Sequence, residues 1–85
     1  MKQTFLIKGK YGLHSRPAFR FVELAKKYQS SIRILYNDKD IDAKSLVSVL
    51  SAGISSGSTI ELLITGDDEV DAMNTLSDFF NNPIE

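Results

Sequence analysis

PAFRFVELAKKY, residues 17–28, carries the clearest helical pattern in the chain. Its apolar residues recur at spacings of three and four and form one face of a helix: Ala18, Phe21, Val22, Ala25 and Tyr28. Pro17 suits the first turn, because the N–H groups of that turn have no partner within a helix. We expect Ser15 to be the N-cap. Lys26 and Lys27 are expected near the C-terminal end, where the helix dipole favours cations.

Strand patterns lie on both sides of this helix. Residues 4–8, 32–36 and 59–65 combine alternation with β-branched and aromatic side chains, which is typical of strands. Residues 37–40, Asn-Asp-Lys-Asp, predict a turn, because Asn and Asp readily adopt left-handed and locally hydrogen-bonded conformations. Residues 41–43 are therefore predicted to return as a short strand antiparallel to 32–36.

Two further helices are predicted in the second half of the chain. Ser45 precedes the apolar run 46–52, and Gly53 closes it, as expected for a short capped helix. The acidic run 67–69 predicts the solvated, positive end of a last helix rather than a cation site. The buried stripe of that helix is predicted to comprise Val70, Met73, Leu76, Ser77 and Phe80. Asn81-Asn82-Pro83 should end it.

The predicted element order is β-α-β-β-α-β-α. We expect one domain over residues 1–85, because a chain of this length has room for one core. Four strands and three helices favour an α+β fold in two layers, with the helices packed on a single face of one sheet. The patterns leave open how the strands other than 32–36 and 41–43 are ordered.

Composition excludes several classes of function. A net charge of −1 is unlike the basic balance of a nucleic-acid binder. The absence of cysteine removes disulfides, thiolate chemistry and cysteine zinc sites. The aliphatic runs are far shorter than the ~20 residues of a membrane span, and the start of the chain lacks a signal-peptide core. We expect a cytoplasmic protein without membrane insertion, nucleic-acid partner, metal or cofactor.

His14, the only histidine, is where the sequence offers chemistry. It lies between Gly12 and a predicted helix start, so we expect it to be exposed. A helix N-terminus attracts anions, and Arg16 adds a guanidinium suited to phosphate oxygens. The predicted anion site comprises Ser15, Arg16, Pro17 and Ala18. A neutral imidazole has one nitrogen free to attack, so this arrangement predicts a phosphoryl group carried on His14. The lack of a second catalytic group nearby disfavours an enzyme with its own turnover.

The loop and helix start read Gly12-Leu13-His14-Ser15-Arg16-Pro17-Ala18. This heptapeptide resembles the active-site signature of the HPr family, the histidine-containing phosphocarriers of the bacterial phosphoenolpyruvate:sugar phosphotransferase system. The resemblance extends over the chain in length, element order and motif placement. It implies an open-faced β-sandwich, a four-stranded antiparallel sheet with three helices on one face. It also implies that His14 accepts a phosphoryl group from enzyme I at Nδ1, beside Arg16, and passes it to IIA domains of sugar permeases.

A second segment, Lys44-Ser45-Leu46, resembles the regulatory serine segment of HPr proteins from low-GC Gram-positive bacteria. The resemblance implies phosphorylation of Ser45 by an HPr kinase/phosphorylase, with a transcription regulator as a further partner. A phosphoserine at a helix N-cap carries about −1.5 to −2 charge, which the positive helix end stabilises. The same charge would lie on the surface that enzyme I approaches. The alternative is a serine that only caps the helix, and the sequence leaves both open.

The residues assigned to partner docking by the resemblance are Phe19, Arg20, Leu46, Val47 and Leu50. Several of them depart from the usual family pattern, as does Ser15, which stands where Ala is commonest. The apolar side chains near Ser45 could form an exposed patch, although at least one of them is expected to face the core. The alternative function is a non-sugar or Crh-like regulatory paralogue that acts mainly through protein–protein interaction. His14 disfavours the Crh-like version, because the known Crh-type relative lacks the active histidine.

Overall fold

Four antiparallel strands form the sheet of this computed structural model, which describes residues 1–82. The elements follow one another as β1 (Lys2–Leu6), α1 (Ser15–Ala25), β2 (Ser31–Tyr36), β3 (Lys39–Asp42), α2 (Leu46–Ser51), β4 (Thr59–Thr65) and α3 (Glu69–Asn81). The predicted order β-α-β-β-α-β-α and the α+β class are confirmed.

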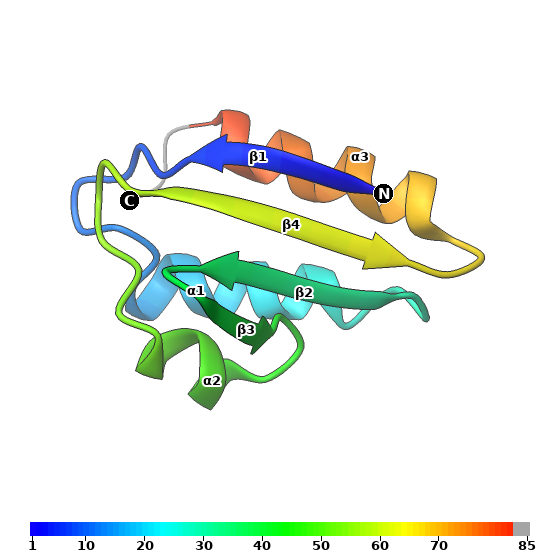
Figure 1. Ribbon diagram of the computed structural model, residues 1–85, viewed down its shortest axis with the longest axis horizontal. Coiled ribbons are helices and arrows are strands. Elements are labelled where there is room, and N and C mark those ends of the chain that lie inside the picture. The colour runs from blue at the N-terminus through cyan, green and yellow to red at the C-terminus, as the bar shows by residue number, and fades with distance from the viewer. Residues whose placement is uncertain (83–85) are drawn as a thin grey trace.

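The strand order, which the sequence left open, is β1-β4-β2-β3. The central strand β4 pairs with β1 on one side, where Ile60 lies opposite Phe5. It pairs with β2 on the other side, where Leu62 lies opposite Ile34. The hairpin partner β3 forms one edge of the sheet and β1 forms the other. The N-terminal strand and the strand near the end of the chain therefore lie side by side (Figure 1).

The helices cover one face of this sheet. In Figure 1, α1 and α3 lie behind the strands, and α2 lies beyond β3. Phe80 of α3 joins the two layers, because its ring is 5.0 Å from that of Phe5 and 5.3 Å from that of Phe21. The largest fully buried aliphatic side chains are Ile7, Leu13, Ile32, Ile34, Ile60, Leu62, Ile64 and Leu76. The predicted open-faced β-sandwich is confirmed.

The opposite face of the sheet carries charges on neighbouring strands. Lys2 Nζ lies 3.7 Å from Glu61 Oε2 across β1 and β4. Arg33 Nε donates to Asp40 Oδ1 over 2.8 Å across β2 and β3, and this bond raises the pKa of Arg33 above its ordinary value. Because these charges stand between polar and half-buried side chains, this face remains hydrated without a covering layer.

Two strand boundaries differ from the prediction. The first strand ends at Leu6 rather than residue 8; Ile7 has left the ladder but stays buried and donates its N–H to Ser58 O over 2.8 Å. The strand predicted at residues 41–43 begins at Lys39. Asn37 and Asp38 have φ values of 48° and 64° and form a two-residue hairpin turn, so the return strand starts earlier than expected.

The helices also differ in detail. The first helix ends at Ala25, before Tyr28 of its predicted stripe; Lys26 is its C-cap, so Lys26 and Lys27 lie near the C-terminal end as expected. In α3, Val70 was predicted to be buried but is 57% exposed. Ala72 is buried instead, one turn before Leu76 on the same face of the helix as Met73 and Phe80. Ser77, which was also predicted to be buried, is half-buried. Pro83 lies outside the described residues.

The acidic start of α3 has a role that the sequence did not reveal. The carboxylate of Asp68 accepts hydrogen bonds from the N–H groups of Gln29 and Ser30, each over 2.9 Å, and from the Ser30 hydroxyl. These bonds lower the pKa of Asp68, with the Ser30 hydroxyl as the largest cause. The prediction of a merely solvated helix start is therefore wrong for Asp68, which ties α3 to the loop before β2.

Candidate functional site

The connection between β1 and α1 is held against a second loop. Gly12 N–H donates to Gly9 O over 3.2 Å and closes a tight turn. Gly12 itself has φ 74°, and a Cβ there would lie 2.8 Å from Ser56 N and still closer to Ile54 O. Leu13, which is buried, donates its N–H to Ile54 O over 3.0 Å. This anchoring fixes the backbone immediately before His14.

His14 is the N-cap of α1, with extended φ and ψ of −128° and 153°. Its side chain is exposed and makes no capping hydrogen bond. The prediction that Ser15 is the N-cap is wrong, because Ser15 is the first residue of the helix. Its φ of 37° is in the left-handed region, which is uncommon for a residue other than glycine, so the backbone beside His14 is strained.

The N–H groups available to an anion are fewer than predicted. Pro17 has no N–H, and Ala18 N–H donates to His14 O over 3.4 Å. Both side chains are buried. The amides of Ser15 and Arg16 belong to the first turn and have no partner within the helix. The predicted four-residue anion site therefore reduces to two backbone amides, together with the exposed guanidinium of Arg16.

These groups line a hollow of about 220 Å³ at the start of α1. Its walls are formed by Tyr11, His14, Ser15, Arg16 and Pro17. An anion in this hollow would meet the imidazole, the guanidinium and the helix N-terminus together, which is the setting that phosphoryl transfer requires. Tyr11 was not among the predicted site residues. The signal for it was an aromatic residue in a short loop bracketed by Gly9 and Gly12.

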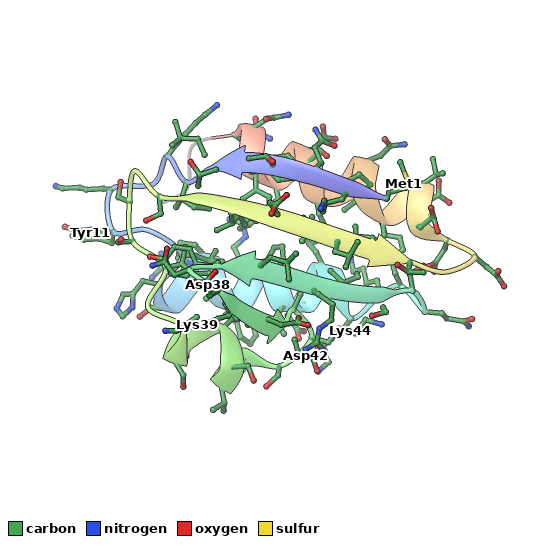
Figure 2. The ribbon with its side chains drawn as sticks, in the orientation of Figure 1. Met1, Tyr11, Asp38, Lys39, Asp42 and Lys44 are labelled. Carbon is green, nitrogen blue, oxygen red and sulfur yellow. The ribbon has the colours of Figure 1, made fainter. Side chains whose placement is uncertain are left out.

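Ser45 is the N-cap of α2, as predicted. Its hydroxyl oxygen accepts a hydrogen bond from Ser48 N–H over 3.3 Å. The preceding residue, Lys44, is held on both sides: its N–H donates to Asp42 Oδ1 over 3.0 Å, and its Nζ donates to Tyr28 O over 2.6 Å. Lys44 and Asp42 lie close together beside α2 in Figure 2. Ser45 is half-buried within this network, so its cap role is established by geometry.

Most of the predicted docking residues lie on the surface of α1 and α2. Phe19 is 53% exposed, Val47 is 74% exposed and Leu50 is 40% exposed. Arg20 is also exposed, and it lines a groove of about 210 Å³ along α1. Leu46 differs, because it is half-buried and packs against the core. The expectation that one residue of the α2 patch faces inward is met by Leu46.

Residues 1–82 contain no group of three or more His, Cys, Asp or Glu side chains that could hold a metal ion. Among the helices of this part of the chain, none combines the length and the hydropathy needed to cross a membrane.

Comparisons with known proteins point in one direction. The family described as "PTS HPr component phosphorylation site" matches residues 1–82. The phosphocarrier protein HPr of Buchnera aphidicola is 48% identical to the chain over 67 residues, which are 79% of each sequence.

Solved structures give the same result. An HPr structure from Thermoanaerobacter tengcongensis superposes with a TM-score of 0.92 at 40% identity, covering 95% of this chain and 91% of that one. Crh, a catabolite repression protein of Bacillus subtilis, superposes with a TM-score of 0.77 at 30% identity, covering 89% of this chain and 87% of that one.

Proposed function

The chain belongs to the HPr family of phosphocarrier proteins of the phosphotransferase system, and we propose that His14 is the residue that carries the phosphoryl group. The observation that supports this most directly is the position of His14: it is exposed, caps α1 and lines a hollow with Arg16. As a phosphocarrier, the protein is a relay between other proteins rather than an enzyme.

The transfer follows from these groups. A lone pair on the imidazole nitrogen, Nδ1 in the family, attacks the phosphorus of phosphorylated enzyme I. The new P–N bond forms as the bond to the donor breaks. The Ser15 and Arg16 amides and the Arg16 guanidinium stabilise the charge on the equatorial oxygens. The second transfer has the same form: a nucleophile on a IIA domain attacks the phosphorus, and the electrons of the P–N bond return to the imidazole.

The test is incubation with enzyme I and labelled phosphoenolpyruvate. The wild-type protein should acquire one acid-labile phosphate. His14→Ala should acquire none, because it lacks the accepting nitrogen. Ser45→Ala is the matched control and should be labelled as the wild type is, since it leaves the hollow unchanged. Retention of the label in His14→Ala would overturn the assignment.

A second modification at Ser45 is supported by its place at the N-cap of α2. Phosphate on this oxygen would lie at the positive end of the helix and would leave the fold intact. Its charge would oppose the approach of enzyme I to the neighbouring surface. Treatment with an HPr kinase should give an acid-stable phosphate that is absent from Ser45→Ala. If several such kinases leave the protein unmodified, Ser45 is only a cap.

Partner docking is proposed for the surface formed by Phe19, Arg20, Leu46, Val47 and Leu50. The exposed apolar side chains of α1 and α2 support this, because buried apolar area at the centre of an interface stabilises transient complexes. The phosphorylated protein is incubated with a panel of IIA domains from sugar and non-sugar systems, in a buffer of cytoplasmic pH and ionic strength. The domains that acquire the phosphoryl group are the acceptors. Transfer to none of them, combined with modification of Ser45, would favour a Crh-like regulatory paralogue.

A further inference from the structure

Tyr11 occupies a position that packing does not explain. Tyr11 is a large hydrophobic residue, yet it is 70% exposed. It lies at the left-hand end of the molecule in Figure 2, in the connection before α1. The ammonium group of Lys10 lies near this ring, with Nζ 5.5 Å from the ring centroid. Such a contact at an exposed site stabilises the fold little, so stability does not account for the aromatic residue.

The backbone holds Tyr11 in a fixed relation to His14. The turn closed by Gly12 N–H and Gly9 O puts Tyr11 at its tip. Immediately after it, Gly12 packs closely against the carbonyl oxygen of Ile54, and Leu13 donates its N–H to that oxygen. Tyr11 and His14 therefore lie on either side of a single anchored dipeptide. This anchor fixes the backbone positions from which the two side chains project.

The hollow at the start of α1 brings the two side chains together. Four of its five lining residues are consecutive, His14 to Pro17, and Tyr11 is the remaining one. The consecutive residues supply the charge and the hydrogen-bond donors. Tyr11 supplies the one phenol ring among the lining residues.

We infer that Tyr11 is a positioning residue for phosphorylated His14. The aromatic ring of Tyr11 forms one wall of the hollow and limits the access of water to the P–N bond. This inference rests on the proposed function of His14. A carrier loses its phosphoryl group unproductively when a water oxygen attacks the phosphorus. In that reaction the P–O bond forms, the P–N bond breaks, the imidazole takes up a proton, and inorganic phosphate leaves. Replacing part of the surrounding water with an aromatic wall slows this loss while the carrier moves between partners.

The experiment measures the lifetime of the phosphorylated protein on its own. Wild type, Tyr11→Phe and Tyr11→Ala are loaded with enzyme I and phosphoenolpyruvate and separated from both. The release of inorganic phosphate is then followed between pH 5 and pH 8. Tyr11→Ala should release phosphate about threefold to tenfold faster than the wild type, the factor expected for one aromatic contact. Tyr11→Phe should match the wild type, because the ring rather than the hydroxyl forms the wall.

Two controls separate this role from a structural one. Val70→Ala removes another exposed apolar side chain, on α3 and outside the hollow, and should leave the release rate unchanged. The unfolding midpoint of Tyr11→Ala should equal that of the wild type, since the side chain is mostly exposed. Equal release rates for wild type and Tyr11→Ala would overturn the inference, as would Tyr11→Phe releasing phosphate as fast as Tyr11→Ala. Failure of the wild type to acquire phosphate would overturn the proposed function as well, so the two failures are distinguishable.

Discussion

The backbone N–H of Leu13 donates to the carbonyl oxygen of Ile54 over 3.0 Å, one residue before His14. This bond joins the connection that carries the candidate site to the connection that follows α2. Gly57 N–H and Ile7 O add a second link of 2.8 Å between the same two segments. The position of His14 is therefore set by a loop that comes much later in the chain.

Gly12→Ala should disrupt the contact between these two connections. The substituted residue would have to keep φ at 74° and would meet Ile54 O and Ser56 N, so we expect a loss of stability on the order of 2 kcal/mol or more. Urea unfolding measures it. Gly57→Ala is the matched control, because its φ is 84° but no atom lies within 4 Å of the added Cβ. A loss in Gly12→Ala no larger than in the control would show that the close approach does not matter.

Arg16→Ala should slow phosphoryl transfer from enzyme I without unfolding the protein. The side chain is exposed, and removal of one charged donor to the phosphoryl oxygens should lower the single-turnover rate by roughly tenfold. Arg16→Lys should recover part of the rate, since an ammonium keeps the charge but lacks the planar fork of donors. Rapid-quench labelling measures all three proteins. Identical rates would exclude the guanidinium from the reaction.

Ser45→Ala should destabilise the fold by about 1 kcal/mol, because Ser48 N–H loses its acceptor at the start of α2. Ser45→Asp should retain most of that stability, since a carboxylate also caps a helix. Thermal unfolding without any kinase compares the two variants. Ser51→Ala, an exposed position at the other end of α2, should be nearly neutral. Equal unfolding midpoints for Ser45→Ala and Ser51→Ala would show that the Ser45 cap does not stabilise the fold.

Asp68→Asn should lower stability at neutral pH, and the difference from the wild type should vanish in acid. Hydrogen bonds from Ser30 and Gln29 lower the pKa of Asp68 below its ordinary value of 3.8. A carboxylate with a lowered folded-state pKa stabilises the protein above its unfolded-state value and loses that contribution as pH falls through the folded-state value. Unfolding curves from pH 7 down to pH 2 should therefore converge below about pH 4.

Asp67→Asn is the control for this series, because the neighbouring carboxylate is exposed. It should follow the wild type across the whole pH range. A constant difference between Asp68→Asn and wild type down to pH 2 would mean that the amide fails because its NH2 group cannot accept a hydrogen bond, and that charge is not involved.

Regular elements could be predicted where one side of the element meets the core. Thr59–Thr65 was predicted with its observed bounds, because Ile60, Leu62 and Ile64 alternate with less buried residues. The buried face of the first helix could also be predicted, since its buried side chains recur with the period of a helix. In both cases the local pattern and the packing agree.

Features set by distant partners could not be predicted from the sequence. Ser15 has the chemistry of an N-cap, but the anchoring of Leu13 to Ile54 places the helix start one residue earlier. Asp68 is satisfied by Gln29 and Ser30, which lie in another loop. The hollow around His14 likewise includes Tyr11, which no local rule connects with it. These contacts depend on how the loops meet.

The two edge strands of the sheet affect the tendency of the protein to aggregate at high concentration. An unpaired strand edge is a template on which other copies can add, and long apolar edges lead to aggregation. Here β3 has only four residues, and three of them are charged: Lys39, Asp40 and Asp42. The opposite edge, β1, begins with Lys2 and buries only Phe5. Short edge strands with charged residues disfavour edge-to-edge pairing between copies of the protein. A carrier of this kind can therefore stay monomeric at high concentration and does not form fibrils.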